Sequence, residues 1–433
     1  MWEITMSFFN WRACSRSIYM LVFLSAVYSG PGYAEGVSFN EALRLAEIQA
    51  PQLQAHQAAF EGASEAVVAA GALPDPKAFI GIDNLPVDGA NKFSTSADFM
   101  TMQKIGVMQD FPNDKKREAR TEAANARVAQ EGVELDLSRI MVRTETAAAW
   151  LNRYFLNRQL AVLEVQEKDN HLLGEVVRAQ LLAGKGMAAD ALLPKQEVIA
   201  LSNRRDDLQR DIAVADAALR RWSGIPAPVA LSGDAPVFVV DPDVLRQHVQ
   251  HHPELQRLKP MEDMARSELH EAEAARHPDW GVELAYQKRG PVFGDMVSFQ
   301  VSADLPLFTS SRQDPQIRAR QKALNSIEAE REAMQREHEA NLEGDIAMVQ
   351  SLQRQIDRLQ KQALPLIQQK LDLQLAAYRS GRGEMSAVLA ARRELRDTEL
   401  QGITLQNQKQ VLAARLYYLF ESHDNFTAKD QQP

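Results

Sequence analysis

The sequence repeats itself after about 200 residues, at a period that indicates a duplicated structural unit. Four short motifs of the first half recur in the second half, in the same order. The pairs are Ala50-Pro51-Gln52-Leu53 with His252-Pro253-Glu254-Leu255, Leu73-Pro74-Asp75 with His277-Pro278-Asp279, Asp110-Phe111-Pro112 with Asp304-Leu305-Pro306, and Ala183-Gly184-Lys185-Gly186 with Ser380-Gly381-Arg382-Gly383. Each match is weak alone, but four matches in register predict two similar units. Each unit is expected to contain a helix, two strands, a very long helix, a glycine turn and a return helix.

The longest helical pattern covers residues 113 to about 183 and contains no proline. At 1.5 Å per residue, its roughly 70 residues would span about 105 Å. The matching segment of the second half, residues 312 to about 380, contains Pro315 near its start and Pro365 further on. Pro365 removes a backbone donor, so we expect a bend there. The other expected helices are residues 39–73, 189–222, 241–276 and 384–420.

Apolar residues in the second long helix recur with alternating steps of four and three. The series is Leu342, Ile346, Val349, Gln353, Ile356, Leu359, Ala363 and Leu366. This spacing predicts a coiled-coil seam against a partner helix. A long antiparallel bundle would show the same pattern.

Four segments, at about residues 77–86, 97–111, 279–289 and 295–307, alternate between apolar and polar side chains. A period of two predicts strands with one apolar and one polar face. Strands of about ten residues suit a tilted barrel that crosses an outer membrane, with lipid outside and water inside. Two hairpins packed on a soluble core remain an alternative. Four strands cannot close a barrel, and an open sheet edge cannot face lipid, so several copies must share one.

The N-terminus has the pattern of a secretory signal peptide. Arg12 and Arg16 precede the short apolar segment 18–27, and Gly32-Tyr33-Ala34 fits a cleavage site. We therefore expect residues 1–34 to be removed. Cys14 is the only cysteine of the chain, so the mature protein would have no disulfide and no thiolate metal site.

The sequence also argues against several classes of function. The formal net charge is −9 and no basic domain stands out, which disfavours nucleic acid as a partner. No Ser/His/Asp set, His-Glu-x-x-His motif or paired-carboxylate motif stands out, so we expect no enzyme activity. No phosphate-binding glycine loop occurs, and we expect no cofactor.

The chain resembles the TolC-like outer-membrane efflux family over nearly all of its mature length. The resemblance is carried by the Pro-x-Leu motifs at Pro51 and Pro253, by the glycine turns at Gly184 and Gly381, and by two segments that end strands. Those segments are Gln109-Asp110-Phe111-Pro112 and Asp304-Leu305-Pro306-Leu307-Phe308. Two further motifs resemble the heavy-metal branch, which serves cobalt–zinc–cadmium or copper–silver pumps. They are Asp83-Asn84-Leu85-Pro86, and Gly106-Val107-Met108-Gln109-Asp110-Phe111-Pro112 followed by Lys116-Arg117.

The resemblance implies a mostly helical fold with a small β part. Three chains would share a twelve-stranded outer-membrane barrel above a periplasmic helical tunnel. It implies an exit duct that contacts outer-membrane lipid, a periplasmic adaptor and an inner-membrane pump of the resistance–nodulation–division type in a Gram-negative cell. The expected layout is signal peptide 1–34, first repeat 35–223, linker 224–240, second repeat 241–422 and polar tail 423–433.

The helix turns are the first candidate sites. In the family such turns form the periplasmic entrance and meet the adaptor; here they contain Gly184, Gly186, Gly381 and Gly383. Family members often place an acidic ring just beyond the second turn, but Ala387 and Ala390 stand at the matching positions. The nearest carboxylates are Asp190 and Glu384, which become the candidate pore-entrance residues, because a ring of three carboxylates would attract cations.

Two sets of residues could bind metal. His248, His251 and His252 have the spacing of one helical face, although histidines at a helix start are usually only surface residues. Met100, Met102 and Met108 share a strand parity and would offer soft thioether ligands if that face lined a pore. They could equally face lipid or pack against neighbours. The resemblance to the heavy-metal branch implies export of heavy-metal cations. The alternatives are a duct of the same family for drugs, organic compounds or secreted peptides, and a periplasmic coiled-coil structural protein. The sequence also leaves open the position of the constriction and the identity of the adaptor and pump.

Overall fold

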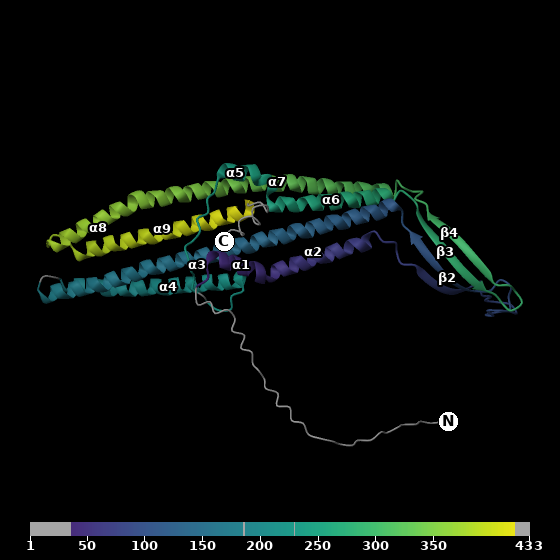
Figure 1. Ribbon diagram of the computed structural model, residues 1–433, viewed down its shortest axis with the longest axis horizontal. Coiled ribbons are helices and arrows are strands. Elements are labelled where there is room, and N and C mark those ends of the chain that lie inside the picture. The colour runs from purple at the N-terminus through teal and green to yellow at the C-terminus, as the bar shows by residue number, and fades with distance from the viewer. Residues whose placement is uncertain (1–35, 185–186, 229, 421–433) are drawn as a thin grey trace, which may run out of the picture.

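The computed structural model describes residues 36–184, 187–228 and 230–420. The predicted signal peptide and the polar tail lie outside the described residues. The helices run lengthwise in an elongated bundle, with the sheet at one end and the helix turns at the other (Figure 1). Among the described helices, none combines the length and the apolar character needed to cross a bilayer.

The first half contains α1 (Phe39–Gln49), α2 (Pro51–Ala70), β1 (Lys77–Asp83), β2 (Met102–Phe111), α3 (Asp114–Leu182), a 3-10 turn (Ala188–Ala191) and α4 (Leu193–Ser223). The expectation of one helix over residues 39–73 is wrong, because the chain breaks at Ala50. A proline disfavours the helical conformation of the residue before it, and Ala50 has an extended ψ of 115°. Pro51 then begins α2, a position where its missing N–H costs nothing.

The second half has the same order of elements. It contains α5 (Pro242–His248), a 3-10 turn (Val249–His251), α6 (Pro253–Ala274), β3 (Asp279–Lys288), β4 (Met296–Asp304), α7 (Gln313–Arg358), α8 (Leu364–Arg379) and α9 (Met385–Phe420). The helix expected over residues 241–276 is also interrupted, directly before Pro253. The equivalent break in both halves agrees with the repeat in the sequence.

Helix α3 is the long unbroken helix that the proline-free segment predicts. It has 69 residues, so it is about 100 Å long. The Asn113 side chain caps its start by accepting a hydrogen bond from the Lys116 N–H at 3.0 Å. Because α3 contacts α2, α4, α6 and α9, it connects both halves of the chain.

The second long helix is interrupted near Pro365. Residues Leu359–Ala363 form a π-helical turn, and Pro365 lies in the first turn of α8. The predicted seam is buried at Leu342, Ile346, Val349, Ile356 and Leu359. It is wrong at Leu366, which is 64% exposed, and the next residue, Ile367, packs against the core instead. A π-helical turn holds an extra residue, so every apolar position after it moves on by one.

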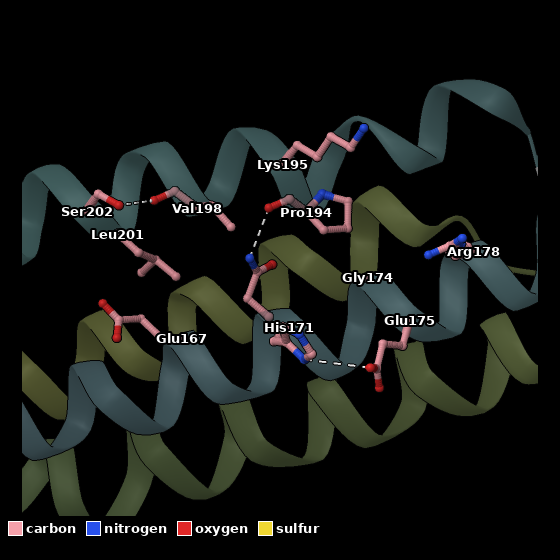
Figure 2. Close-up of a pocket in the computed structure, with 11 residues that line it drawn as sticks. Glu167, His171, Gly174, Glu175, Arg178, Pro194, Lys195, Val198, Leu201 and Ser202 are labelled. Carbon is pink, nitrogen blue, oxygen red and sulfur yellow. Dashed lines mark hydrogen bonds and ion pairs between the residues drawn. The ribbon is translucent and has the colours of Figure 1, made fainter.

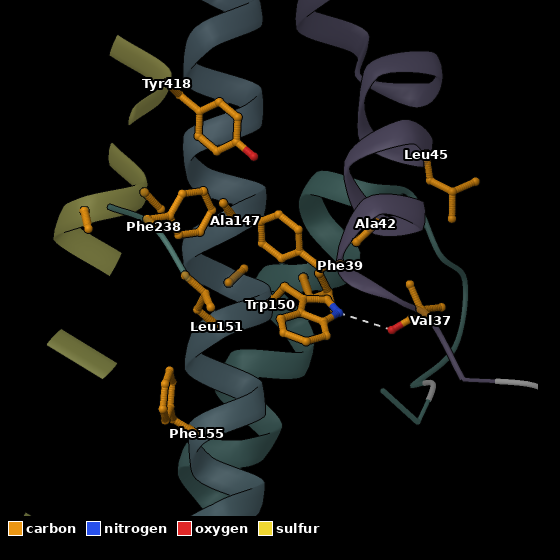
Figure 3. Close-up of a cluster of buried hydrophobic side chains, with 14 of the residues drawn as sticks. Val37, Phe39, Ala42, Leu45, Ala147, Trp150, Leu151, Phe155, Phe238 and Tyr418 are labelled. Atoms are coloured by element: carbon orange, nitrogen blue, oxygen red, sulfur yellow. Dashed lines mark hydrogen bonds between the residues drawn. The ribbon is translucent and has the colours of Figure 1, made fainter. Parts of the chain in front are cut away.

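The largest core cluster lies where α1 and the linker between the halves cross the long helices (Figure 3). Trp150 is fully buried there, and its Nε1–H donates to the Val37 carbonyl at 3.1 Å. Phe39 meets the Trp150 ring edge-on, with centroids 5.4 Å apart. Phe238 from the linker and Tyr418 from α9 complete the cluster. This core holds the helices together between the sheet and the helix turns.

Candidate functional site

The sheet has one continuous apolar face. Its strands are antiparallel in the order β1-β2-β3-β4, and β2 pairs with β3, which joins the two halves. The register aligns apolar side chains in rows across the strands, such as Ile80, Ile105, Tyr286 and Val297. The face also contains Val107, Trp280, Val282, Leu284, Phe299 and Val301. Ile80 is 84% exposed and Phe299 67% exposed, so the chain by itself leaves this face open. An exposed apolar surface of this kind marks contact with a partner or a membrane.

The opposite face of the sheet is polar. The Lys104 ammonium lies 2.7 Å from the Glu283 carboxylate, and Glu283 is paired with Gln300 on β4. Lys77 and Asp110 form a further ion pair at 2.8 Å. The alternation predicted from the sequence is therefore confirmed in these strands.

The three methionines do not share one strand. Met102 and Met108 lie on the polar face of β2, as the parity predicts. The expected start of this strand near residue 97 is wrong, because β2 begins at Met102 and Met100 lies in the preceding turn. Asp98 holds that turn by accepting a hydrogen bond from the Met100 N–H at 2.8 Å. Asn84 ends β1 earlier than residue 86, since its φ of 54° is left-handed.

Glycines shape the two helix turns. Gly184 ends α3 with a φ of +67°, and Gly381 ends α8 with a φ of +74°. A Cβ at either position would meet open space, so the constraint is the backbone conformation and not crowding. At Gly383, a Cβ would lie 3.0 Å from the Ala377 Cβ, which is a close approach. Gly186 lies outside the described residues.

Side chains from the two turns meet each other. The Tyr378 hydroxyl donates a hydrogen bond to the Gln180 side chain, which joins the end of α8 to the end of α3. Burial raises the pKa of Tyr378 above its ordinary value, and the nearby Asp190 carboxylate adds to the shift. Asp190 is half-buried on the 3-10 turn, whereas Glu384 is exposed directly before α9. Asp190 therefore lies between the two hairpins, and Glu384 faces solvent in the single chain.

A groove of about 520 Å³ lies between α3 and α4 near the first turn (Figure 2). Its lining residues are Glu167, Asn170, His171, Gly174, Glu175, Arg178, Pro194, Lys195, Val198, Leu201 and Ser202. Asn170 is 5% exposed, and its Nδ2 donates to the Pro194 carbonyl at 2.9 Å. Gly174 on α3 faces Pro194 on α4. Because neither residue has a long side chain, the space between the two helices stays open there. The sequence did not single out this groove, because Gly174 and Pro194 come together only when α3 packs against α4.

Ion pairs tie the two hairpins together below the turns. The Arg204 guanidinium on α4 lies 2.6 Å from the Asp397 carboxylate on α9. Arg393 on α9 pairs with Glu197 on α4, and Arg396 on α9 lies 3.2 Å from Asp169 on α3. The partners are far apart in the sequence, so no local pattern predicts them.

The three histidines do not form the helical face that their spacing suggested. His248 ends α5, and its Nδ1 lies 2.7 Å from the Val244 carbonyl oxygen. His251 ends the 3-10 turn and is exposed. His252 caps the start of α6 and stacks on His338 of α7, with ring centroids 3.8 Å apart. The sequence did not single out His338.

Solved structures with similar folds are outer-membrane proteins. VceC of Vibrio cholerae matches with a TM-score of 0.71 and 18% identity, over 88% of this chain and 95% of that chain. CusC, whose structures describe transmembrane channel formation, matches with a TM-score of 0.75 and 16% identity, over 91% and 95%. The MtrE channel of Neisseria gonorrhoeae matches with a TM-score of 0.67 and 16% identity, over 88% of each chain.

Sequence comparison adds the family to this fold. No curated protein sequence matches the chain. A profile of the outer membrane efflux protein family matches residues 244–420, which include the second hairpin of the sheet and helices α6 to α9. The family is described by efflux, and the structures of CusC and MtrE are described as those of channels, not of enzymes. Residues 244–420 are therefore similar to the outer membrane efflux protein family, and the chain as a whole has the fold of these outer-membrane proteins.

Proposed function

We propose that the chain is one of three identical subunits of an exit duct in the outer membrane, part of a tripartite efflux system. The observation that carries this proposal is the sheet, which has an exposed apolar face and two open edges. Strands β1 and β4 each have one neighbour in the described chain. An edge with unpaired backbone groups cannot face lipid, so β4 of one chain pairs with β1 of the next. Three chains with four strands each give twelve strands, enough for a closed barrel with a water-filled centre.

The chemistry of the two faces supports this arrangement. In a closed barrel the apolar face contacts lipid, and the polar face with Lys104, Glu283 and Gln300 lines the channel. Phe111 is paired with Trp280 at the end of the sheet that adjoins the helices. Aromatic residues at this level form the girdle that membrane barrels place at the interface with water. Met102 and Met108 then face the channel.

The helical part extends into the periplasm, and its turns form the entrance. Adaptor helices dock at the turns around Gly184 and Gly381 and in the groove between α3 and α4, which offers charged and apolar contacts together. An inner-membrane pump of the resistance–nodulation–division type supplies the energy. Asp190 and Glu384 are the carboxylates nearest the entrance, where a threefold arrangement would favour cations. Residues 1–34 act as the signal peptide, 35–223 and 241–422 as the two repeats, 224–240 as the linker and 423–433 as the tail.

The exported compound is a heavy-metal cation. This part of the proposal rests on the motif at residues 83–86 and on the end of β2 followed by Lys116 and Arg117. Lys116 has a structural role that fits the motif: its ammonium lies 2.5 Å from the Asp279 carboxylate, which also accepts a hydrogen bond from the Asn113 N–H. These contacts join the start of α3 to the start of β3 of the other repeat.

Deleting the gene should make cells sensitive to at least one of copper, silver, zinc, cobalt, nickel and cadmium. The reason is that periplasmic metal has no exit when the duct is lost. Growth inhibition across these six metals, with a strain complemented by the wild-type gene as the control, measures the effect. Sensitivity to dyes, detergents or antibiotics with unchanged tolerance of all six metals would show that the duct carries organic compounds instead.

A further inference from the structure

A cluster of potential metal ligands lies outside the proposed channel and the helix turns. It contains His252 and Glu254 at the start of α6, and His338 on α7. One ligand atom from each residue lies within 4.8 Å of the other two. The Glu254 Oε2 is 3.1 Å from the His338 Nε2. Two separate helices thus bring two imidazoles and a carboxylate to one point.

Both imidazoles lie mostly away from solvent. His252 is 7% exposed, and the side chain of His338 is 13% exposed. The Nε2 of His338 is buried without a hydrogen bond in the described chain, because its contact with Glu254 lacks hydrogen-bond geometry. A metal ion between His338 and Glu254 would give this nitrogen a ligand bond in place of its 3.1 Å contact with the carboxylate.

The first half of the chain provides an internal comparison. Its equivalent break before a proline has Ala50 and Gln52 where the second half has His252 and Glu254. Ala50 makes the same break without a side-chain cap. The turn therefore does not require histidine or glutamate at these two positions.

We propose that His252, Glu254 and His338 bind one divalent transition-metal ion per chain, of the class that Zn²⁺ represents. Two imidazoles, a carboxylate and a water molecule make up a common zinc coordination set. Ligand atoms at about 2.0–2.2 Å from such an ion lie closer together than 4.8 Å, so the side chains must move inward. The two imidazoles are stacked with an interplanar angle of 24°, so at least one ring must also rotate before both nitrogens point at one ion. Glu254 can do this because its side chain is 52% exposed, and the exposed side leaves room for the water.

Two further features oppose binding and keep the affinity moderate. Nδ1 of His252 accepts a long hydrogen bond, 3.3 Å, from the Glu254 N–H. A metal bound to Nδ1 takes the lone pair that accepts this hydrogen bond. A metal bound to Nε2 requires a proton on Nδ1, which then can no longer accept. The hydrogen bond is therefore lost whichever nitrogen binds the metal. The Arg415 cation also acts on this site, while the Glu254 carboxylate offsets its charge. The bound ion would fix α6 to α7 beside Phe420, the last residue of α9. This role is independent of the exported compound.

The test is zinc binding to the purified, tag-free trimer, measured by equilibrium dialysis and elemental analysis after treatment with a chelator. We expect saturable binding of one zinc per chain. His338→Gln and Glu254→Gln should each weaken it by about 100-fold or more, since losing even an outer partner of a metal ligand costs about 10–100-fold. His252→Asn should do the same while keeping the helix cap, because asparagine is a good capping residue.

The matched controls are His248→Gln and His251→Gln, which remove exposed neighbouring histidines and should leave binding unchanged. The oligomeric mass of each variant, measured in parallel, identifies any that fails to fold, and Glu254→Gln is the substitution least able to disturb the fold. Absence of saturable binding to the wild type would overturn the proposal. Equal zinc affinity in the wild type, His338→Gln and Glu254→Gln would overturn it as well.

Discussion

Gly381→Val is expected to abolish export while the protein reaches the outer membrane in normal amount. Gly381 has a φ of +74°, and a branched residue in this left-handed conformation costs roughly 1–2 kcal/mol. The strain falls on the turn between α8 and α9, where the Arg382 and Gly383 amides hydrogen-bond back to the Ala377 carbonyl. The turn must therefore change shape at the proposed docking surface for the adaptor. The measurement is the tolerance that the variant gene restores to a deletion strain.

Two controls separate the shape of this turn from general damage. Gly381→Asn should retain export, because asparagine tolerates the left-handed conformation. Gly294→Val should also retain it, since Gly294 has open space around it and lies in the loop between β3 and β4, at the other end of the molecule. Normal export by Gly381→Val would mean that this turn is not the docking surface.

Phe299→Arg is expected to prevent assembly in the outer membrane. Phe299 lies on the apolar face of β4, paired with Leu284 of β3. An arginine at the middle of a barrel wall costs about 2–4 kcal/mol, and three copies would cost about 6–12 kcal/mol per trimer. Membrane fractionation and the amount of trimer in detergent extracts measure the effect.

The neighbouring residue of the same strand provides the control. Ser298 is paired with Ala285 on the polar face, the face that lines the channel in the proposed barrel. Ser298→Arg should assemble normally, because a charge in a water-filled channel is not moved into lipid. If both arginine variants assemble equally well, the apolar face does not contact lipid.

The sequence predicted the faces of the strands well because their alternation is local. The side chains of Trp280 and Leu284 had to share a face once β3 formed, whatever lay around it. The length of α3 followed from the missing prolines in the same way. The same reasoning failed where a local signal was read too coarsely. The sequence predicted one helix running through Pro51, whereas the structure has a break at Ala50 and Pro51 begins a new helix.

Register errors had a second cause. The seam was extended through Leu366 on a fixed spacing, but the π-helical turn before Pro365 shifts all later positions. A proline predicts a bend, yet the sequence does not show how many residues the bend absorbs. The predicted strand was also too long at its start. Met100 lies in a turn that Asp98 stabilises, so it is not part of β2.

The candidate sites were the least predictable part. The glycine turns were found because each glycine has a local conformational role. His252 was a candidate ligand together with His248 and His251, whereas in the structure it stacks on His338, which comes from another helix far along the chain. The ion pairs between α9 and the first hairpin, such as Arg204 with Asp397, depend on packing in the same way. Contacts of this kind leave no periodic signal in one sequence.

The assembly of three chains is tested most directly by the mass of the purified protein in detergent. Light scattering corrected for bound detergent should give the mass of three mature chains, because four strands per chain need two further chains to close the barrel. Circular dichroism on the same sample verifies that the strands are present. A monomer with intact strand content would contradict the shared barrel.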